Sequence, residues 1–192
     1  KDDNGVTQPQ GALVAIEPET GYIRALVGGR SWSETELNRV SQIRRQPGSA
    51  FKIFLYAAVI DQGHPVTDTM MCEPVSYPGA RPGEPYRPVD FGSRPYHYAP
   101  LNVRQAVAIS DNVIATRWAQ EVGPATIADY AERLGIKSPL QHNIPLALGA
   151  SEVTPLEMTV AAATLASGGI RPEPIAVLKL LDTRGHVVEE NR

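Results

Sequence analysis

Ser49 and Lys52 stand three residues apart at the start of an apolar stretch, residues 51–60. Residues at this spacing share one face of a helix, so the lysine ammonium can lie beside the serine hydroxyl. A serine becomes a nucleophile when a neighbouring base takes its proton, and a lysine can be that base when burial lowers its pKa. A helix N-terminus also presents backbone N–H groups to an oxyanion. The pair therefore predicts Ser49 as a nucleophile and Lys52 as its base.

Both residues also have a structural interpretation. Serine is favoured as a helix N-cap, and a lysine on an apolar helix can extend its charged end to water. The S-x-x-K spacing is short, and by itself it does not separate these interpretations from catalysis.

A second motif, Ser110-Asp111-Asn112, interrupts a helical pattern. A turn at this point can direct the first and third side chains to one side. Ser110 would then relay a proton between Lys52 and a leaving group, and Asn112 would donate a hydrogen bond to a substrate carbonyl. We interpret Asp111 as structural. The alternative is a plain turn between helices, because all three residue types favour turns and caps.

The order of these motifs carries further information. S-x-x-K, S-D-N and K-T-G together are the signature of class A β-lactamases and penicillin-binding proteins. The first two occur here in that order, whereas no Lys-Thr-Gly or Lys-Ser-Gly follows Asn112. Two motifs, each in its expected helical context, favour catalysis over the structural interpretations.

Local patterns predict the elements that position these residues. Pro18 and Gly21 indicate a turn between two strand-like stretches, and Thr154, Pro155 and Glu157 form a capping-box pattern that starts a helix. The expected elements are strands over 11–17 and 22–27, a buried helix over 51–60, helices over 101–109, 113–121, 124–134 and about 154–167, and a hairpin over 175–181 and 186–188.

Residues 64–100 are rich in proline, glycine and tyrosine, which predicts mostly irregular structure with short strands. Within them, residues 71–98 have three interpretations: a packed loop, a docking loop for a partner, or the wall of a substrate groove. We interpret the single cysteine, Cys72, as an ordinary loop or core thiol. The histidines lack metal-ligand spacing and are interpreted as surface or loop residues; they are His64, His97, His142 and His186.

Composition limits the functions open to the chain. It has 192 residues, a formal net charge of −3 and a pI near 5.8, without the clustered basic surface that nucleic-acid binding needs. No stretch approaches the roughly 20 apolar residues of a membrane span. The polar start, residues 1–10, shows no signal peptide, so we expect an internal segment of a longer protein, with any membrane anchor upstream.

The sequence resembles the transpeptidase domain of class A (bifunctional) penicillin-binding proteins over nearly its whole length. Four segments carry the resemblance: 11–29 (GALVAIEPETGYIRALVGG), 38–52 (NRVSQIRRQPGSAFK), 108–112 (AISDN) and 148–169 (LGASEVTPLEMTVAAATLASGG). The resemblance implies an α+β fold of the serine β-lactamase and DD-transpeptidase type, an α/β sandwich in which helices flank an antiparallel sheet. Residues 1–192 would be the N-terminal portion of that single domain, with the C-terminal strands missing from this chain.

The resemblance also implies a mechanism. Ser49 would attack the carbonyl between the two terminal D-alanines of a peptidoglycan stem peptide, with Lys52 as its base. Ser110 and Asn112 would serve proton transfer and substrate orientation. D-alanine would leave, and an amine of a second stem peptide would attack the acyl-enzyme to form a cross-link. β-Lactam antibiotics would acylate Ser49 as mimics of the D-Ala-D-Ala end, and no metal or organic cofactor is implied.

The same resemblance sets expectations for the parent protein. It would work outside the cytoplasmic membrane, anchored in that membrane, with a glycosyltransferase domain upstream and the missing C-terminal segment as a partner of this chain. That segment would supply one oxyanion-hole N–H, and losing one such donor costs about 10²–10³ in rate in other enzymes. We therefore expect the 192-residue chain alone to acylate poorly or not at all, which rapid stoichiometric labelling by a fluorescent penicillin would contradict.

Several alternatives remain open. A serine β-lactamase shares the first two motifs but needs an activated water for deacylation, and no E-x-x-L-N segment lies between Ser110 and Arg192. A penicillin-sensing receptor domain acylates without turnover, and a D-Ala-D-Ala carboxypeptidase transfers the acyl group to water. A non-catalytic interaction fragment is the last possibility. The identity of an upstream domain, and product analysis with and without an amine acceptor, separate these functions.

Overall fold

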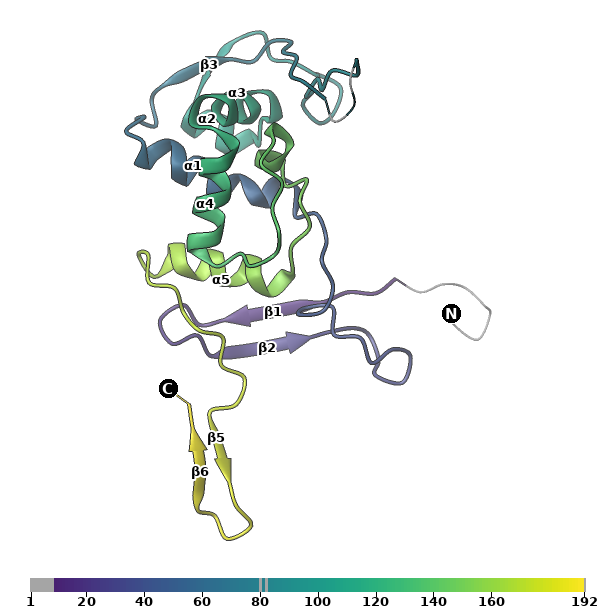
Figure 1. Ribbon diagram of the computed structural model, residues 1–192, viewed down its shortest axis with the longest axis vertical. Coiled ribbons are helices and arrows are strands. Elements are labelled where there is room, and N and C mark those ends of the chain that lie inside the picture. Colours follow the sequence, from purple (N-terminus) through teal and green to yellow (C-terminus); the bar gives the residue numbers. More distant parts are fainter. Residues whose placement is uncertain (1–8, 80, 82, 192) are drawn as a thin grey trace. The chain divides into compact units, whose positions relative to one another are not determined.

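The structure, a computed structural model, describes residues 9–79, 81 and 83–191 (Figure 1). These residues divide into two compact units. The first contains the described residues up to Arg45, Leu134–Ser138 and those from Val153 onward; the second contains those within Gln46–Arg133 and Pro139–Glu152. None of the helices in the described ranges combines the length and the apolar character of a membrane span.

The first unit begins with the expected hairpin. Strand β1 (Leu13–Ile16) pairs antiparallel with β2 (Ile23–Val27), so the hairpin is confirmed, with strands shorter than predicted. Gly21 in the connection has a φ of +76°, and a Cβ at this position would lie 1.9 Å from the carbonyl oxygen of Glu173. The turn therefore requires glycine both for its backbone conformation and for this close approach.

Helix α5 (Pro155–Ala166) contacts β1 and starts at the predicted capping box. Glu157 N donates to Thr154 Oγ1 at 3.2 Å, and Thr154 N donates to Glu157 Oε2 at 2.7 Å. Both backbone N–H groups would otherwise lack a partner at the helix start, so the prediction made from this four-residue pattern is confirmed.

The predicted C-terminal hairpin is also confirmed, with slightly different bounds. Strand β5 (Lys179–Leu181) pairs antiparallel with β6 (Val187–Glu190). Every residue of both strands is exposed. The large apolar side chains that this segment leaves exposed are Val177, Leu178, Leu180, Leu181, Val187 and Val188.

The second unit is built around the apolar helix. The 3-10 turn η1 (Gly48–Phe51) leads into α1 (Lys52–Asp61), which contacts α3 (Asn112–Val122) and the 3-10 turn η2 (Ile144–Leu148). The largest fully buried side chains of these four elements are Phe51, Phe54, Leu55, Ile114 and Leu146. The helix predicted to be buried therefore forms the centre of this unit.

Helix α2 (Val103–Ile109) starts two residues later than predicted. The helix predicted from Leu101 is wrong at this end because Pro100–Asn102 form β4, which pairs antiparallel with β3 (Thr69–Met71). Asn102 then caps α2, accepting a hydrogen bond from Gln105 N at 2.8 Å. Helix α4 (Pro124–Leu134) has the predicted bounds.

The fold class is α+β, as expected. Within the described ranges the sheets are two-stranded and antiparallel, β1 with β2, β3 with β4 and β5 with β6. The helices α1 to α4 belong to the second unit except for Leu134, the last residue of α4, and α5 belongs to the first. The second unit therefore holds every residue that the sequence singled out for chemistry.

Candidate active site

Lys52, the first residue of α1, is buried, with 5% of its surface exposed. Its Nζ donates to Ser110 O at 2.6 Å and to Ser110 Oγ at 3.0 Å. It also lies 2.8 Å from Asn112 Oδ1 and 3.2 Å from Asp111 O. The interpretation in which Lys52 extends its charge to water is therefore wrong, because four oxygen acceptors hold its end inside the unit.

Burial lowers the pKa of Lys52 to about 8, and this effect outweighs the opposing influence of the carboxylates of Asp111 and Asp90. An amine with a pKa in this range can release its proton near neutral pH. The sequence prediction that burial would lower the pKa of this lysine agrees with the geometry.

The Ser110–Asn112 turn owes its shape to an unusual backbone conformation. Ser110 has φ +55° and ψ +42°, in the left-handed region that non-glycine residues rarely adopt. The next residue, Asp111, caps α3 by accepting a hydrogen bond from Ile114 N at 2.6 Å. The left-handed turn aims the side chains of Ser110 and Asn112 at Lys52, and the structural interpretation of Asp111 as a cap agrees with its position.

Ser49 lies within η1 and is exposed. It caps neither helical element, since Pro47 precedes η1 and Phe51 precedes α1, both without a side-chain hydrogen bond. The N-cap interpretation of Ser49 is therefore wrong. No hydrogen bond of the Ser49 hydroxyl occurs within the described residues, so the structure leaves this oxygen available and does not join it directly to Lys52.

A close backbone contact places η1. Gly149 has a φ of +73°, and a Cβ at this position would lie 2.3 Å from the carbonyl oxygen of Gly48. Only glycine permits η2 and the residue before Ser49 to approach this closely. The contact fixes the backbone from which Ser49 projects.

Ser49, Ser110 and Asn112 line one open pocket of about 590 Å³. The rest of its wall comes mainly from the loop between β3 and β4, and the lining residues there are Asp90, Phe91, Gly92, Ser93, Arg94 and His97. Three of the four predicted site residues therefore share a pocket, and Lys52 is hydrogen-bonded to two of these three. Part of residues 71–98 forms the wall of this pocket, as the groove interpretation of that segment requires.

Comparison with known proteins decides the family. The sequence profile described as "Penicillin binding protein transpeptidase domain" matches residues 11–191. The chain belongs to this family.

Individual relatives agree with this assignment. Penicillin-binding protein 2D of Bacillus subtilis is 36% identical over 188 residues, which cover 98% of this chain and 27% of that protein. The structure of penicillin-binding protein 1A from Haemophilus influenzae superposes with a TM-score of 0.88 at 33% identity, covering 95% of this chain and 27% of that one. The PonA1 protein of Mycobacterium tuberculosis in complex with penicillin V gives a TM-score of 0.79 at 25% identity, over 94% of this chain and 51% of that one.

These comparisons confirm the resemblance to class A penicillin-binding transpeptidase domains that the four sequence segments indicated. The chain spans about a quarter of the length of the curated relative it matches. Over its matched length the chain thus shares the fold of solved penicillin-binding proteins, whereas the roles of its individual residues are inferred from their geometry.

The sequence did not predict the part played by Asp90. Its Oδ1 accepts a hydrogen bond from Asn112 N at 2.7 Å, while Asn112 Nδ2 donates to Val89 O at 2.9 Å. Asn112 Oδ1 faces Lys52, so one hydrogen of Nδ2 remains able to donate to another group. A lone aspartate in an irregular loop gives no sequence signal for such a contact, which joins segments 22 residues apart.

Proposed function

We propose that this chain carries the acyl-serine site of a DD-transpeptidase that cross-links peptidoglycan, with Ser49 as the nucleophile. One observation carries the proposal: the buried Lys52 is hydrogen-bonded to the side chains of Ser110 and Asn112, which line the same pocket as the exposed Ser49. The family assignment supports it.

The proposal includes a sequence of proton transfers, and the hydrogen bond from Lys52 Nζ to Ser110 Oγ supports the step between these two residues. Neutral Lys52 accepts the hydroxyl proton of Ser49 as the serine oxygen bonds to the carbonyl carbon between two D-alanines. When the tetrahedral intermediate collapses, the proton passes from Lys52 through Ser110 to the departing D-alanine nitrogen. The C–N bond breaks, D-alanine leaves, and an ester remains on Ser49. An amine of a second stem peptide then attacks this ester, the C–O bond to Ser49 breaks, and the proton lost by the amine passes through Lys52 to the serine oxygen.

Substrate orientation falls to Asn112 in this proposal. Hydrogen bonds with Lys52 and with Val89 O hold its side chain in one orientation. The second hydrogen of Nδ2 therefore has a fixed direction. Hydrogen bonding to the stem-peptide amide then needs no reorganisation.

β-Lactams are proposed to acylate the same serine as mimics of the D-Ala-D-Ala end. The occurrence of penicillin V in a complex with the related PonA1 protein supports this part. We also propose that residues 1–192 form the N-terminal portion of one transpeptidase domain, acting outside the cytoplasmic membrane where peptidoglycan is cross-linked.

The test is intact mass spectrometry after prolonged incubation with benzylpenicillin, comparing the wild type with Ser49→Ala. Ser93→Ala is the matched control, because Ser93 is an exposed serine of the same pocket. We expect one slowly formed adduct on the wild type and on Ser93→Ala, and none on Ser49→Ala.

The same measurement on a chimera, in which this chain replaces the matching segment of Bacillus subtilis penicillin-binding protein 2D, should give an adduct that forms faster. Equal adducts on Ser49→Ala, or none in the chimera, would remove Ser49 as the nucleophile.

A second arm separates transpeptidase from carboxypeptidase activity. The chimera is given a stem-peptide substrate with and without an added amine acceptor. Formation of the amide product supports transpeptidation, and release of the free acid alone, whatever the acceptor concentration, favours a carboxypeptidase.

A further inference from the structure

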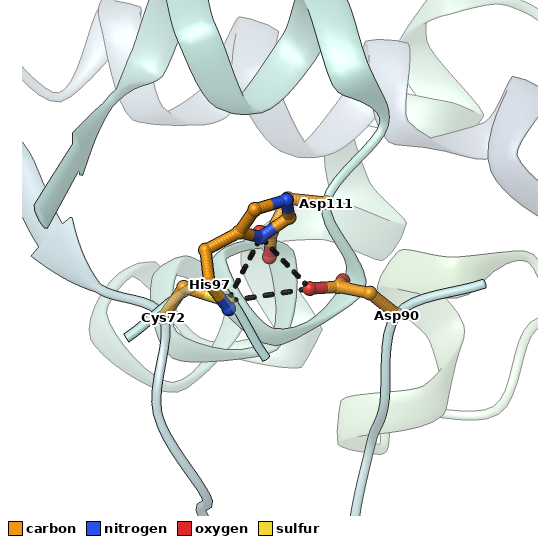
Figure 2. Close-up of side chains that lie close together, drawn as sticks. All are labelled: Cys72, Asp90, His97 and Asp111. Carbon is orange, nitrogen blue, oxygen red and sulfur yellow. Dashed lines mark hydrogen bonds and ion pairs between the residues drawn. The ribbon is translucent and has the colours of Figure 1, made fainter. Parts of the chain in front are cut away.

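Four potential metal ligands lie close together beside the active-site pocket, which Asp90 and His97 also line: Cys72, Asp90, His97 and Asp111 (Figure 2). Cys72 directly follows β3, Asp90 and His97 belong to the loop between β3 and β4, and Asp111 caps α3. Each offers one ligand atom, and all four atoms lie within 4.8 Å of one another. The spacing in the sequence matches no short metal motif, which is why the histidines were interpreted as ordinary loop residues.

Four of the six separations among the ligand atoms are close to the edges of a tetrahedron around a metal ion. Cys72 Sγ lies 3.2 Å from Asp90 Oδ2 and 3.4 Å from His97 Nδ1. His97 Nδ1 lies 3.3 Å from Asp90 Oδ2 and 3.1 Å from Asp111 Oδ2. For an ion about 2.0–2.3 Å from each ligand, neighbouring ligand atoms lie about 3.3–3.8 Å apart. The remaining pairs lie within 4.8 Å, so side-chain rotation of Cys72, Asp90 or Asp111 would complete the tetrahedron.

The two carboxylates are oriented by a second set of contacts. Asp90 uses Oδ1 to accept from Asn112 N, at 2.7 Å, and turns Oδ2 toward the cluster. Asp111 uses Oδ1 to accept from Ile114 N, at 2.6 Å, and likewise turns Oδ2 toward the cluster. Backbone hydrogen bonds of this kind fix the orientation of metal-binding side chains.

A backbone contact also reaches the sulfur atom of Cys72. His97 N donates to Cys72 Sγ at 3.3 Å, an interaction that suits an electron-rich sulfur. The His97 ring presents Nδ1 to the cluster, as Figure 2 shows, and the side chain is 34% exposed. The three other ligands are buried, so the exposed histidine edge offers the path by which an ion can enter.

We propose that Cys72 Sγ, Asp90 Oδ2, His97 Nδ1 and Asp111 Oδ2 bind a single Zn²⁺ ion that ties the pocket loop to the start of α3. A thiolate and an imidazole favour zinc over magnesium or calcium, which prefer oxygen ligands. Four protein ligands make the site closed and structural, with no position left for a reacting water. Binding replaces the thiol proton of Cys72, which passes to solvent.

The position of the ion gives it a role in the geometry of the catalytic turn. Asp111 lies between Ser110 and Asn112, and Asp90 holds Asn112 N. An ion bound to both aspartates therefore fixes the turn that faces Lys52. The ligands are positioning residues, because they act on the pocket through this turn.

The test measures zinc and cobalt binding by the complete 192-residue chain, produced without a polyhistidine tag. The chain is stripped with a chelator, loaded with ZnCl₂, desalted and assayed for zinc by mass spectrometry; affinity comes from competition with a zinc-binding dye. The variants are Cys72→Ser and His97→Gln. His64→Gln is the matched control, because His64 is a half-buried histidine whose Nδ1 also faces a carboxylate, that of Asp68 at 3.3 Å.

We expect the wild type and His64→Gln to retain one zinc per chain. We expect Cys72→Ser and His97→Gln to bind more weakly by at least about 10- to 100-fold, the loss caused even by removing an outer partner of a metal ligand. Circular dichroism of the metal-free variants checks that their helices form. If either variant fails to fold, the absorption spectrum of the wild type loaded with Co²⁺ tests whether Cys72 is a ligand. Tetrahedral cobalt bound to a thiolate shows a sulfur-to-metal charge-transfer band.

Three results would overturn the proposal. The wild type retains no zinc after desalting, His97→Gln retains as much zinc as His64→Gln, or the Co²⁺ form lacks the thiolate band. In each case the four groups form a hydrogen-bonded cluster without a metal ion. Ser49 labelling by benzylpenicillin does not enter this test, so its outcome is independent of the proposed transpeptidase activity.

Discussion

Lys52 is held by neutral oxygen atoms instead of a direct carboxylate partner. Its Nζ contacts two backbone carbonyls, a hydroxyl and an amide oxygen. Asp111, one of the two carboxylates that influence the pKa of Lys52, directs its oxygens to Ile114 N and to His97. A direct ion pair would stabilise the ammonium form strongly, whereas dipolar acceptors orient the amine and leave it able to lose a proton. This arrangement suits a lysine that acts as a base.

Replacing Lys52 by arginine tests the need for a group that can be deprotonated. Arginine keeps the positive charge but remains protonated in proteins. We expect Lys52→Arg to slow covalent labelling of Ser49 by about 10²–10⁴-fold, the range for loss of a general base. The measurement is the rate of adduct formation in the chimera with penicillin-binding protein 2D. Lys137→Arg, at an exposed position, is the control, and an unchanged rate in Lys52→Arg would contradict the role as a base.

Substitution of Ser110 by glycine separates the effect on the free energy of unfolding from the effect on the rate of adduct formation. Glycine adopts the left-handed backbone of this residue without strain, whereas the hydrogen bond from Lys52 Nζ to Ser110 Oγ is lost in Ser110→Gly. Because these effects oppose each other, the free energy of unfolding should stay within about 1 kcal/mol of the wild type. Adduct formation should still fall by about 10²-fold or more, because the proton relay is missing.

Ser110→Ala completes this comparison. It removes the same hydroxyl but keeps the strained backbone, so it should be less stable than Ser110→Gly in urea unfolding. Both variants should label slowly. Normal labelling of Ser110→Gly would show that the hydroxyl has no part in proton transfer.

At the level of elements, contacts between near neighbours were predictable and contacts between distant segments were not. The capping box of α5, the bounds of α4 and both hairpins depend on a few consecutive residues, and the sequence predicted them. The start of α2 depends on strand pairing with β3, some 30 residues away, and the sequence prediction failed there.

The same division applies to the site. The motif residues Ser49, Lys52, Ser110 and Asn112 carry recognisable local patterns, and the structure brings them together. The cluster around Cys72 and His97 depends on how an irregular loop folds back on α3. No periodicity specifies that path, because proline- and glycine-rich loops take their course from tertiary contacts.

The capping box of α5 gives a prediction for one element. Thr154→Ala removes the side chain that accepts from Glu157 N, so the free energy of unfolding should fall by about 1 kcal/mol. Thr159→Ala is the matched control inside the same helix, where the hydroxyl donates to Pro155 O and to no other group of the described residues. Alanine is a better helix former than threonine, so this control should change stability by less than about 0.5 kcal/mol. Equal losses in urea unfolding would show that the cap contributes nothing.

Across the whole molecule, burial is distributed unevenly. Seven of the eleven residues of α3 are buried, whereas every residue of β5 and β6 is exposed. Backbone hydrogen bonds covered by packed side chains open only with the surrounding core, while those of an exposed hairpin open locally. The same chain therefore contains a resistant centre and a segment that opens at little cost.

Hydrogen exchange measured by mass spectrometry tests this distribution. Peptides from α1 and α3 should exchange slowest, and the amides of Val187–Glu190 should exchange at least about 10³-fold faster than those of α3, because their opening requires no unfolding of the core. A dilution series is the control, since self-association through the exposed apolar side chains would protect the hairpin only at high protein concentration. If the hairpin is as protected as α3 at every concentration, its strands are covered by other residues of the chain. The apolar side chains of Leu180 and Val188 would then contribute to a folded core, and their substitution by serine should lower the free energy of unfolding by about 1–3 kcal/mol instead of leaving it unchanged.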